Sequence, residues 1–199
     1  MRRGEVDFGP VTAGACPICG QPGCGREITG YERTAIDLFP EVRRGRVPIA
    51  RFLCRATRRT FSLLPMELAP YHQYLVPTML RVLVLFGVEL CVAGTSLEAA
   101  LEKALPQDHD VTVSLLRWWV CVLCAGFRRG HSELRKPFGL SDLRSGSGFR
   151  GMLEEVQAYR RGCRVRDPPA LGADLLRVMG QYSAAAKRFL FGRSSQERR

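Results

Sequence analysis

The sequence predicts a mainly α-helical protein that begins with a small β ribbon. Up to about residue 59 the chain is rich in glycine and turns, and the segments 26–33 and 47–54 each alternate apolar with polar residues. Such alternation is typical of half-exposed strands. After residue 65, apolar residues recur at the spacing of a buried helical face. We therefore expect an N-terminal β-hairpin ribbon followed by helices.

Changes in composition divide the chain into five predicted segments. The first, 1–15, is expected to be a flexible arm, and the last, 193–199, a disordered tail. Between them we expect a ribbon domain at 16–65, a helix-turn-helix domain at 66–130 and a helical C-terminal region at 131–192.

The ribbon segment opens with "CPICG", in which Cys16 and Cys19 have the spacing of a metal-binding pair. Two thiolates at this spacing can bind one ion, and the following glycine lets backbone amides turn toward the sulfurs. The alternative is a pair of incidental core cysteines. A zinc ribbon closes with a second pair on the returning strand, where this chain has Cys54 but then Thr57. Threonine is a poor zinc ligand, so the second pair is incomplete.

The sequence offers two substitutes for the missing ligand. Cys24 lies on the same loop as the first pair, and His72 lies further along the chain. The remaining alternatives are a site with three ligands and a site that has lost its metal. We favour Cys24, and we predict a small β zinc ribbon whose Zn²⁺ ligands are Cys16, Cys19, Cys24 and Cys54.

The first predicted helix runs from about His72 or Val76 to Val92 and is apolar enough to suggest a membrane span. Arg81 and Glu89 lie within it, however, and each charge costs roughly 2.5–3.5 kcal/mol near the centre of a bilayer. We expect a buried core helix and no membrane association.

A second helix is predicted from Thr95 or Ser96 to Leu105, and a third begins after the polar break "PQDHD" with Thr112 or Ser114 as its N-cap. This layout predicts a helix-turn-helix, whose second helix inserts its N-terminal part into the major groove of DNA. The expected base-contacting residues are Thr112, Ser114 and Arg117. Trp118 and Trp119 are expected to pack this helix onto its neighbours.

The rest of the chain predicts further helices. After a loop at 130–148 we expect helices at 149–163 and 171–191. Cys121 and Cys124 also form a CxxC, but inside an apolar helical window, where such a pair is expected to pack in the core.

The charge points to a polyanionic partner. The formal net charge is +11, which favours nucleic acid first and an anionic membrane second. Between residues 43 and 59 there are seven arginines and no acidic residue. They are expected to contact phosphates without regard to sequence: Arg43, Arg44, Arg46, Arg51, Arg55, Arg58 and Arg59.

The sequence also bears on the cellular compartment and on catalytic activity. The first residues lack the apolar segment of a signal peptide, so we expect a cytoplasmic protein whose eight cysteines serve metal or core roles rather than disulfides. The histidines are isolated, and no nucleophile motif or phosphate-binding loop occurs. We therefore expect no enzymatic activity.

At "RRTFSLLP" and "PYHQY" the sequence resembles a bacterial family of uncharacterised proteins related to insertion-sequence transposases. Members of that family begin with a zinc ribbon that opens CPxCG, and a helix-turn-helix with a TLRRW-like segment follows. Here "CPICG", "RRTFSLLP", "PYHQY" and "VSLLRWW" occur in that order over roughly residues 14–128. The chain departs from the family pattern at Thr57, where the second cysteine of the returning pair is missing.

The resemblance implies DNA binding of the transposase N-terminal type. It does not imply transposase activity, because no DDE-type catalytic domain is recognisable. We expect a non-enzymatic DNA-binding protein, either an accessory protein or a regulator derived from a mobile element. Its expected partners are DNA and either a second copy of itself or a transposition-related protein. The alternatives are a protein-interaction module built on the ribbon and apolar helices, and an RNA-binding zinc ribbon.

Overall fold

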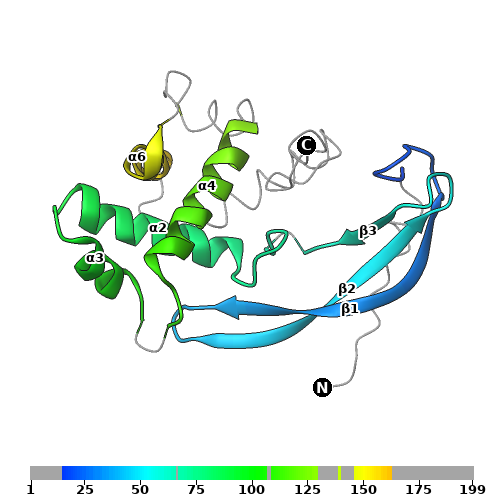
Figure 1. The fold of residues 1–199 in the computed structure, drawn as a ribbon, viewed down its shortest axis with the longest axis horizontal. Coiled ribbons are helices and arrows are strands. Elements are labelled where there is room, and N and C mark those ends of the chain that lie inside the picture. Colours follow the sequence, from blue (N-terminus) through cyan, green and yellow to red (C-terminus); the bar gives the residue numbers. More distant parts are fainter. Residues whose placement is uncertain (1–14, 66, 107–108, 130–138, 140–145, 163–199) are drawn as a thin grey trace. The chain divides into compact units, whose positions relative to one another are not determined.

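The computed structural model describes residues 15–65, 67–106, 109–129, 139 and 146–162. Within these residues, three antiparallel strands form one sheet in the order β1-β2-β3, and four helices follow (Figure 1). The strands are β1 (Gly25–Asp37), β2 (Arg43–Cys54) and β3 (Thr60–Leu63). The helices are α2 (Val76–Cys91), α3 (Leu97–Ala104), α4 (Val113–Arg129) and α6 (Gly148–Gly162).

The fold is mixed α/β rather than mainly α. The predicted strands at 26–33 and 47–54 extend to 25–37 and 43–54, because their pairing continues beyond the alternating segments into the hairpin tip. A third strand, β3, lies in the "TFSL" segment, where no strand was predicted. The expected arm at 1–15, the helix at 171–191 and the tail at 193–199 lie outside the described residues, Ala15 excepted.

The chain forms two compact units. The ribbon unit contains residues 1–34 and 46–65, and the helical unit contains 35–45 and 66–199. The tip of the β1–β2 hairpin therefore belongs to the helical unit, although the sequence alone placed the whole hairpin in the ribbon domain. Ile36 and Leu38 from this tip are buried in the core of the helical unit.

In the ribbon unit, β2 and β3 pair from Ala50↔Leu63 to Leu53↔Thr60. This register places Phe52 opposite Phe61, and their rings stack with centroids 5.4 Å apart. Phe52 is buried and Phe61 packs beside the cysteines of the loop. The end of the sheet is thus fixed next to the predicted metal ligands.

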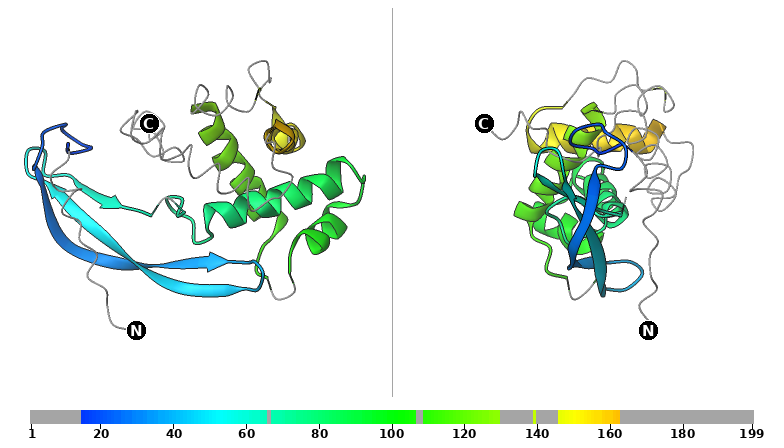
Figure 2. Two further views of the ribbon diagram at one scale, coloured as in Figure 1. Left: turned by 180° about the vertical axis from the view of Figure 1, so that it is seen from behind. Right: turned by 90° about the vertical axis from the view of Figure 1, so that its right-hand side faces the viewer.

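In the helical unit, α2 contacts all three other helices, and α3 and α6 lie on opposite sides of it (Figures 1 and 2). Its buried side chains include Met79, Leu83 and Phe86. Trp119 of α4 is fully buried, and the centroid of its ring lies 4.8 Å from that of Tyr74. The prediction of a core helix is confirmed, and among the described residues no helix is long and apolar enough to cross a membrane.

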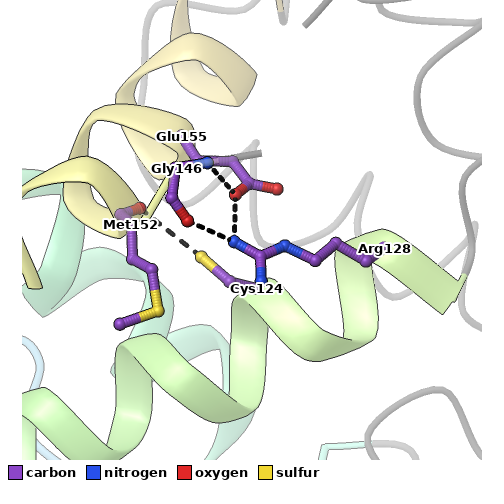
Figure 3. A network of polar contacts seen from close by, with 5 residues as sticks. All are labelled: Cys124, Arg128, Gly146, Met152 and Glu155. Atoms are coloured by element: carbon purple, nitrogen blue, oxygen red, sulfur yellow. Dashed lines mark hydrogen bonds and ion pairs between the residues drawn. The ribbon is translucent and has the colours of Figure 1, made fainter. Parts of the chain in front are cut away.

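Polar contacts fix α6 in this unit (Figure 3). The buried Glu155 accepts hydrogen bonds from Arg128 at 2.9 Å and from the Gly146 amide at 3.2 Å. Cys124 is buried and its thiol donates to the Met152 carbonyl at 3.4 Å. Its expected core role is confirmed, whereas Cys121 is exposed. The pair was predicted to share a buried face, but it straddles the edge of that face.

The predicted capping residues act at two helix starts. The Ser96 hydroxyl accepts from the Ala99 amide at the start of α3. The Thr112 hydroxyl accepts from the Leu115 amide at 3.2 Å at the start of α4. Such caps satisfy backbone donors that lack a partner within the helix. Between α3 and α4 lie the eight residues 105–112, which is longer than the three- or four-residue turn of the usual helix-turn-helix.

Candidate metal centre

Four cysteines of the ribbon unit gather at one point. The sulfurs of Cys16, Cys19, Cys24 and Cys54 all lie within 4.8 Å of one another. All but Cys19 are buried. Four sulfurs at about 2.3 Å from a tetrahedral zinc would be roughly 3.8 Å apart, so a small contraction of the cluster would suit the ion. The predicted gathering of these four residues is confirmed.

The first turn of the centre is a metal-binding knuckle in its backbone. The Gly20 amide donates to the Cys16 carbonyl at 2.8 Å, and the Cys16 amide donates to the Gln21 carbonyl at 3.0 Å. Gly20 has φ +77°, in the left-handed region that glycine occupies without steric cost. The CPICG sequence therefore folds as its motif predicts.

The returning turn has the same backbone. The Arg58 amide donates to the Cys54 carbonyl at 2.9 Å, and the Cys54 amide donates to the Arg59 carbonyl at 2.8 Å. Arg58 has φ +58° and so takes the place that Gly20 holds in the first turn. Cys54 corresponds to Cys16, and Thr57 corresponds to Cys19. The second knuckle keeps its shape and lacks only the second thiol.

Cys24 supplies the fourth sulfur. Its Sγ lies 3.6 Å from that of Cys54, and its carbonyl accepts from the Arg55 amide at 3.3 Å, which ties the loop to the second knuckle. His72, the other substitute considered, is not part of the cluster and instead contacts the Trp118 ring.

Thr57 acts on the centre without joining it. A hydrogen bond from its side chain is the largest influence on Cys54 and, despite desolvation by burial, lowers the pKa of that thiol to about 6. A thiol with so low a pKa is a thiolate at neutral pH, which is the form that binds metal. Threonine at this position therefore favours the ligand form of Cys54.

Cys19 has the opposite tendency. The largest single influence, a backbone hydrogen bond from Gln21, lowers its pKa, but burial and hydrogen bonds with the three other thiols together raise it to about 12. Neighbouring thiols cannot all ionise without a compensating charge. A divalent cation would supply that charge and displace the remaining protons.

The seven arginines predicted to contact phosphates are all exposed. Arg43 and Arg44 belong to the helical unit and pair with Glu41 and Asp110. The other five belong to the ribbon unit. Among the described residues, no ion pair includes any of these five, and Arg51 donates a hydrogen bond to the Thr60 hydroxyl at 3.2 Å.

The start of α4 is open to solvent. Thr112, Ser114 and Arg117 are exposed, as a base-contacting role requires. The Arg117 guanidinium also lies 5.5 Å from the ring centre of Phe149 in α6. Trp119 packs in the core as predicted, whereas Trp118 packs only in part: it meets the His72 ring but stays 51% exposed. Trp119 and Val120 are both fully buried, so the core-facing side of α4 begins at Trp119 and Trp118 lies outside it.

Comparison of the chain with protein-family models, curated proteins and solved structures finds no match. The resemblance to transposase-related proteins thus stays a prediction from the sequence motifs.

Proposed function

We propose that this protein binds DNA and that a zinc ion in the cysteine centre orders part of the binding surface. The observation that carries the proposal is the Cys54–Arg59 turn. It contains one cysteine of the centre together with three exposed arginines, Arg55, Arg58 and Arg59. A metal bound to Cys54 would hold these arginines in one arrangement, and arginines suit the bidentate recognition of phosphate.

Zinc suits the centre better than a hard cation. A set of four thiolates is typical of structural zinc sites, whereas magnesium and calcium prefer oxygen ligands. Four thiolates and Zn²⁺ would together carry two negative charges. Residues 46–65 carry five arginines and no acidic residue, so this part of the ribbon stays positive with the metal bound.

The helical unit supplies the second part of the proposal. Thr112, Ser114 and Arg117 lie exposed at the start of α4, in the position from which a helix contacts base edges. The ribbon arginines would bind phosphates, and Thr112, Ser114 and Arg117 would add sequence preference. The family resemblance favours an accessory protein or regulator derived from a mobile element, without catalytic activity.

The test measures binding of a labelled DNA duplex by the zinc-loaded protein at several salt concentrations. Log affinity falls linearly with log salt concentration. Each arginine that no longer neutralises a phosphate should make this slope flatter by roughly 0.9. Replacing Arg55, Arg58 and Arg59 together by alanine should therefore flatten the slope by about 2–3. Arg161→Ala is the matched control, because Arg161 is an exposed arginine in the last turn of α6, outside the ribbon unit.

Arg117→Ala tests whether the start of α4 contacts bases. On a duplex selected for tight binding, the variant should lose roughly 1–3 kcal/mol and discriminate less between sequences. Equal binding by the parent and by the triple variant would contradict the role of these three arginines. An affinity independent of salt would contradict DNA binding through phosphate contacts and favour a protein partner. Tighter binding of RNA than of DNA duplexes would favour the RNA-binding alternative.

A further inference from the structure

An exposed tryptophan lies on the proposed DNA-contacting helix. Ser114 and Trp118 are four residues apart on α4, so they lie on one stripe of the helix, and both are exposed. At 51% exposure, Trp118 is one of few large apolar side chains left open to solvent in the described part of the chain. Its neighbour Trp119 has no exposed surface. The open indole is therefore not a consequence of loose packing in this helix.

A buried residue holds the indole in place. The ring of His72 meets that of Trp118 edge to face, with centroids 5.6 Å apart and an interplanar angle of 81°. His72 itself is only 7% exposed, and its amide donates to the Ala69 carbonyl. The indole thus rests against a fixed neighbour. Such a ring can receive a flat ligand with little loss of conformational entropy.

A second exposed ring lies beside His72. Tyr71 is 75% exposed, and its φ of +67° is rare for a residue with a bulky side chain. A conformation of this kind costs about 1–3 kcal/mol and is found in turns and at functional sites. Tyr71 thus precedes in the chain the buried histidine whose ring contacts Trp118.

The charge of α4 indicates what these rings would bind. Arg117 precedes Trp118 and is exposed, and α4 contains no acidic residue. A ligand that combines negative charge with flat apolar faces is a nucleic acid. Inside a duplex both faces of a base are covered by its neighbours, so a protein ring stacks most readily on unpaired bases.

We propose that Trp118 and Tyr71 form a stacking surface for unpaired bases, so that the DNA bound by this protein includes a single-stranded segment. This inference rests on the proposed DNA binding and extends it to a class of substrate. It adds Trp118 to the residues expected to contact DNA, in place of the packing role predicted from the sequence.

The experiment compares three probes of equal length: a thymidine strand, the same strand with abasic sites in place of its bases, and a duplex. Each is titrated into the zinc-loaded full chain, and both affinity and tryptophan fluorescence are recorded. The chain contains two tryptophans, one exposed and one buried, so a change in emission on binding reports chiefly on Trp118. Because Trp118 is exposed, Trp118→Leu should fold normally, which circular dichroism verifies.

Stacking should quench the fluorescence with the thymidine strand and not with the abasic strand. Trp118→Leu should weaken binding of the thymidine strand by roughly 5- to 150-fold and leave the abasic strand unaffected. Trp118→Phe, which keeps an aromatic ring, should lose less affinity for the thymidine strand. Cys121→Ser, one turn along the same exposed face, should bind as the parent does.

Equal affinity for the thymidine and abasic strands would overturn the stacking surface. If the duplex still binds with a steep salt dependence, the proposed DNA binding stands without it. If none of the three probes binds, both proposals fail.

Discussion

Gly20 and Arg58 occupy equivalent positions in two turns that frame one cluster of cysteines. Each has a left-handed backbone, and each donates its amide to the carbonyl of the cysteine four residues earlier. The ribbon therefore contains two knuckles of the same shape, of which the second has Thr57 where the first has Cys19.

Cys24 and Thr57 should be interchangeable as the position of the fourth thiol. Cys24→Ser should lower zinc retention, because it leaves three thiolates. Adding Thr57→Cys to that variant should restore retention, because position 57 has the backbone geometry of Cys19. Zinc content after dialysis against a weak chelator measures both effects. If Cys24→Ser alone retains zinc as the parent does, Cys24 is not a ligand.

Thr57→Val should make zinc binding more sensitive to acid. The hydroxyl of Thr57 makes the largest contribution to lowering the pKa of Cys54 to about 6. Valine has the same shape but no donor, so the pKa of Cys54 should rise and protons should compete with the metal at higher pH. The pH at which half of the zinc is released should increase. Thr57→Ser, which keeps a hydroxyl, is the matched control, and an unchanged midpoint in the valine variant would contradict the role of this hydrogen bond.

Arg58→Gly should stabilise the ribbon and weaken DNA binding at once. A non-glycine residue in the left-handed region costs about 1–2 kcal/mol, part of which glycine loses again through the greater freedom of the unfolded chain. We expect a gain of up to about 1 kcal/mol in the free energy of unfolding. The same change removes one phosphate-binding side chain and should flatten the salt slope by about 0.9. A variant that gains stability without losing affinity would show that Arg58 does not contact DNA.

Gly87→Ala should loosen α6 from α2. A Cβ at Gly87 would clash with Nε2 of Gln157, which donates to the Val84 carbonyl at 2.9 Å. The clash and the disruption of this buried hydrogen bond should together destabilise the protein by about 1–3 kcal/mol. Gly45→Ala, where a Cβ meets open space, is the control. Chemical denaturation of both variants measures the difference.

The sequence predicted those parts of the molecule that depend on local pattern. The CPICG turn, the alternating cores of β1 and β2 and the cap at Thr112 all follow from short-range spacing. The four-cysteine cluster also followed, because Cys24 was the nearest thiol able to replace the one missing at position 57.

The features that the sequence did not reveal depend on tertiary contacts. Whether Trp118 or Trp119 faces the core depends on where α2 and α6 lie, which helical periodicity alone does not give. The left-handed turn at Arg58 was hidden because no glycine marks it. The strand β3 was hidden because "TFSL" is too short for its alternation to stand out, and it pairs through its register with β2.

The central claim is that the metal orders an arginine surface that binds DNA. The salt dependence of duplex binding, measured before and after removal of zinc, tests it most directly. We predict one zinc per chain and a salt slope that becomes flatter by about 2–3 when the metal is removed, because Arg55, Arg58 and Arg59 lose their common arrangement. Return of the steep slope on adding zinc back would support the same conclusion. A metal-free chain that binds DNA with the same affinity and the same slope would contradict it.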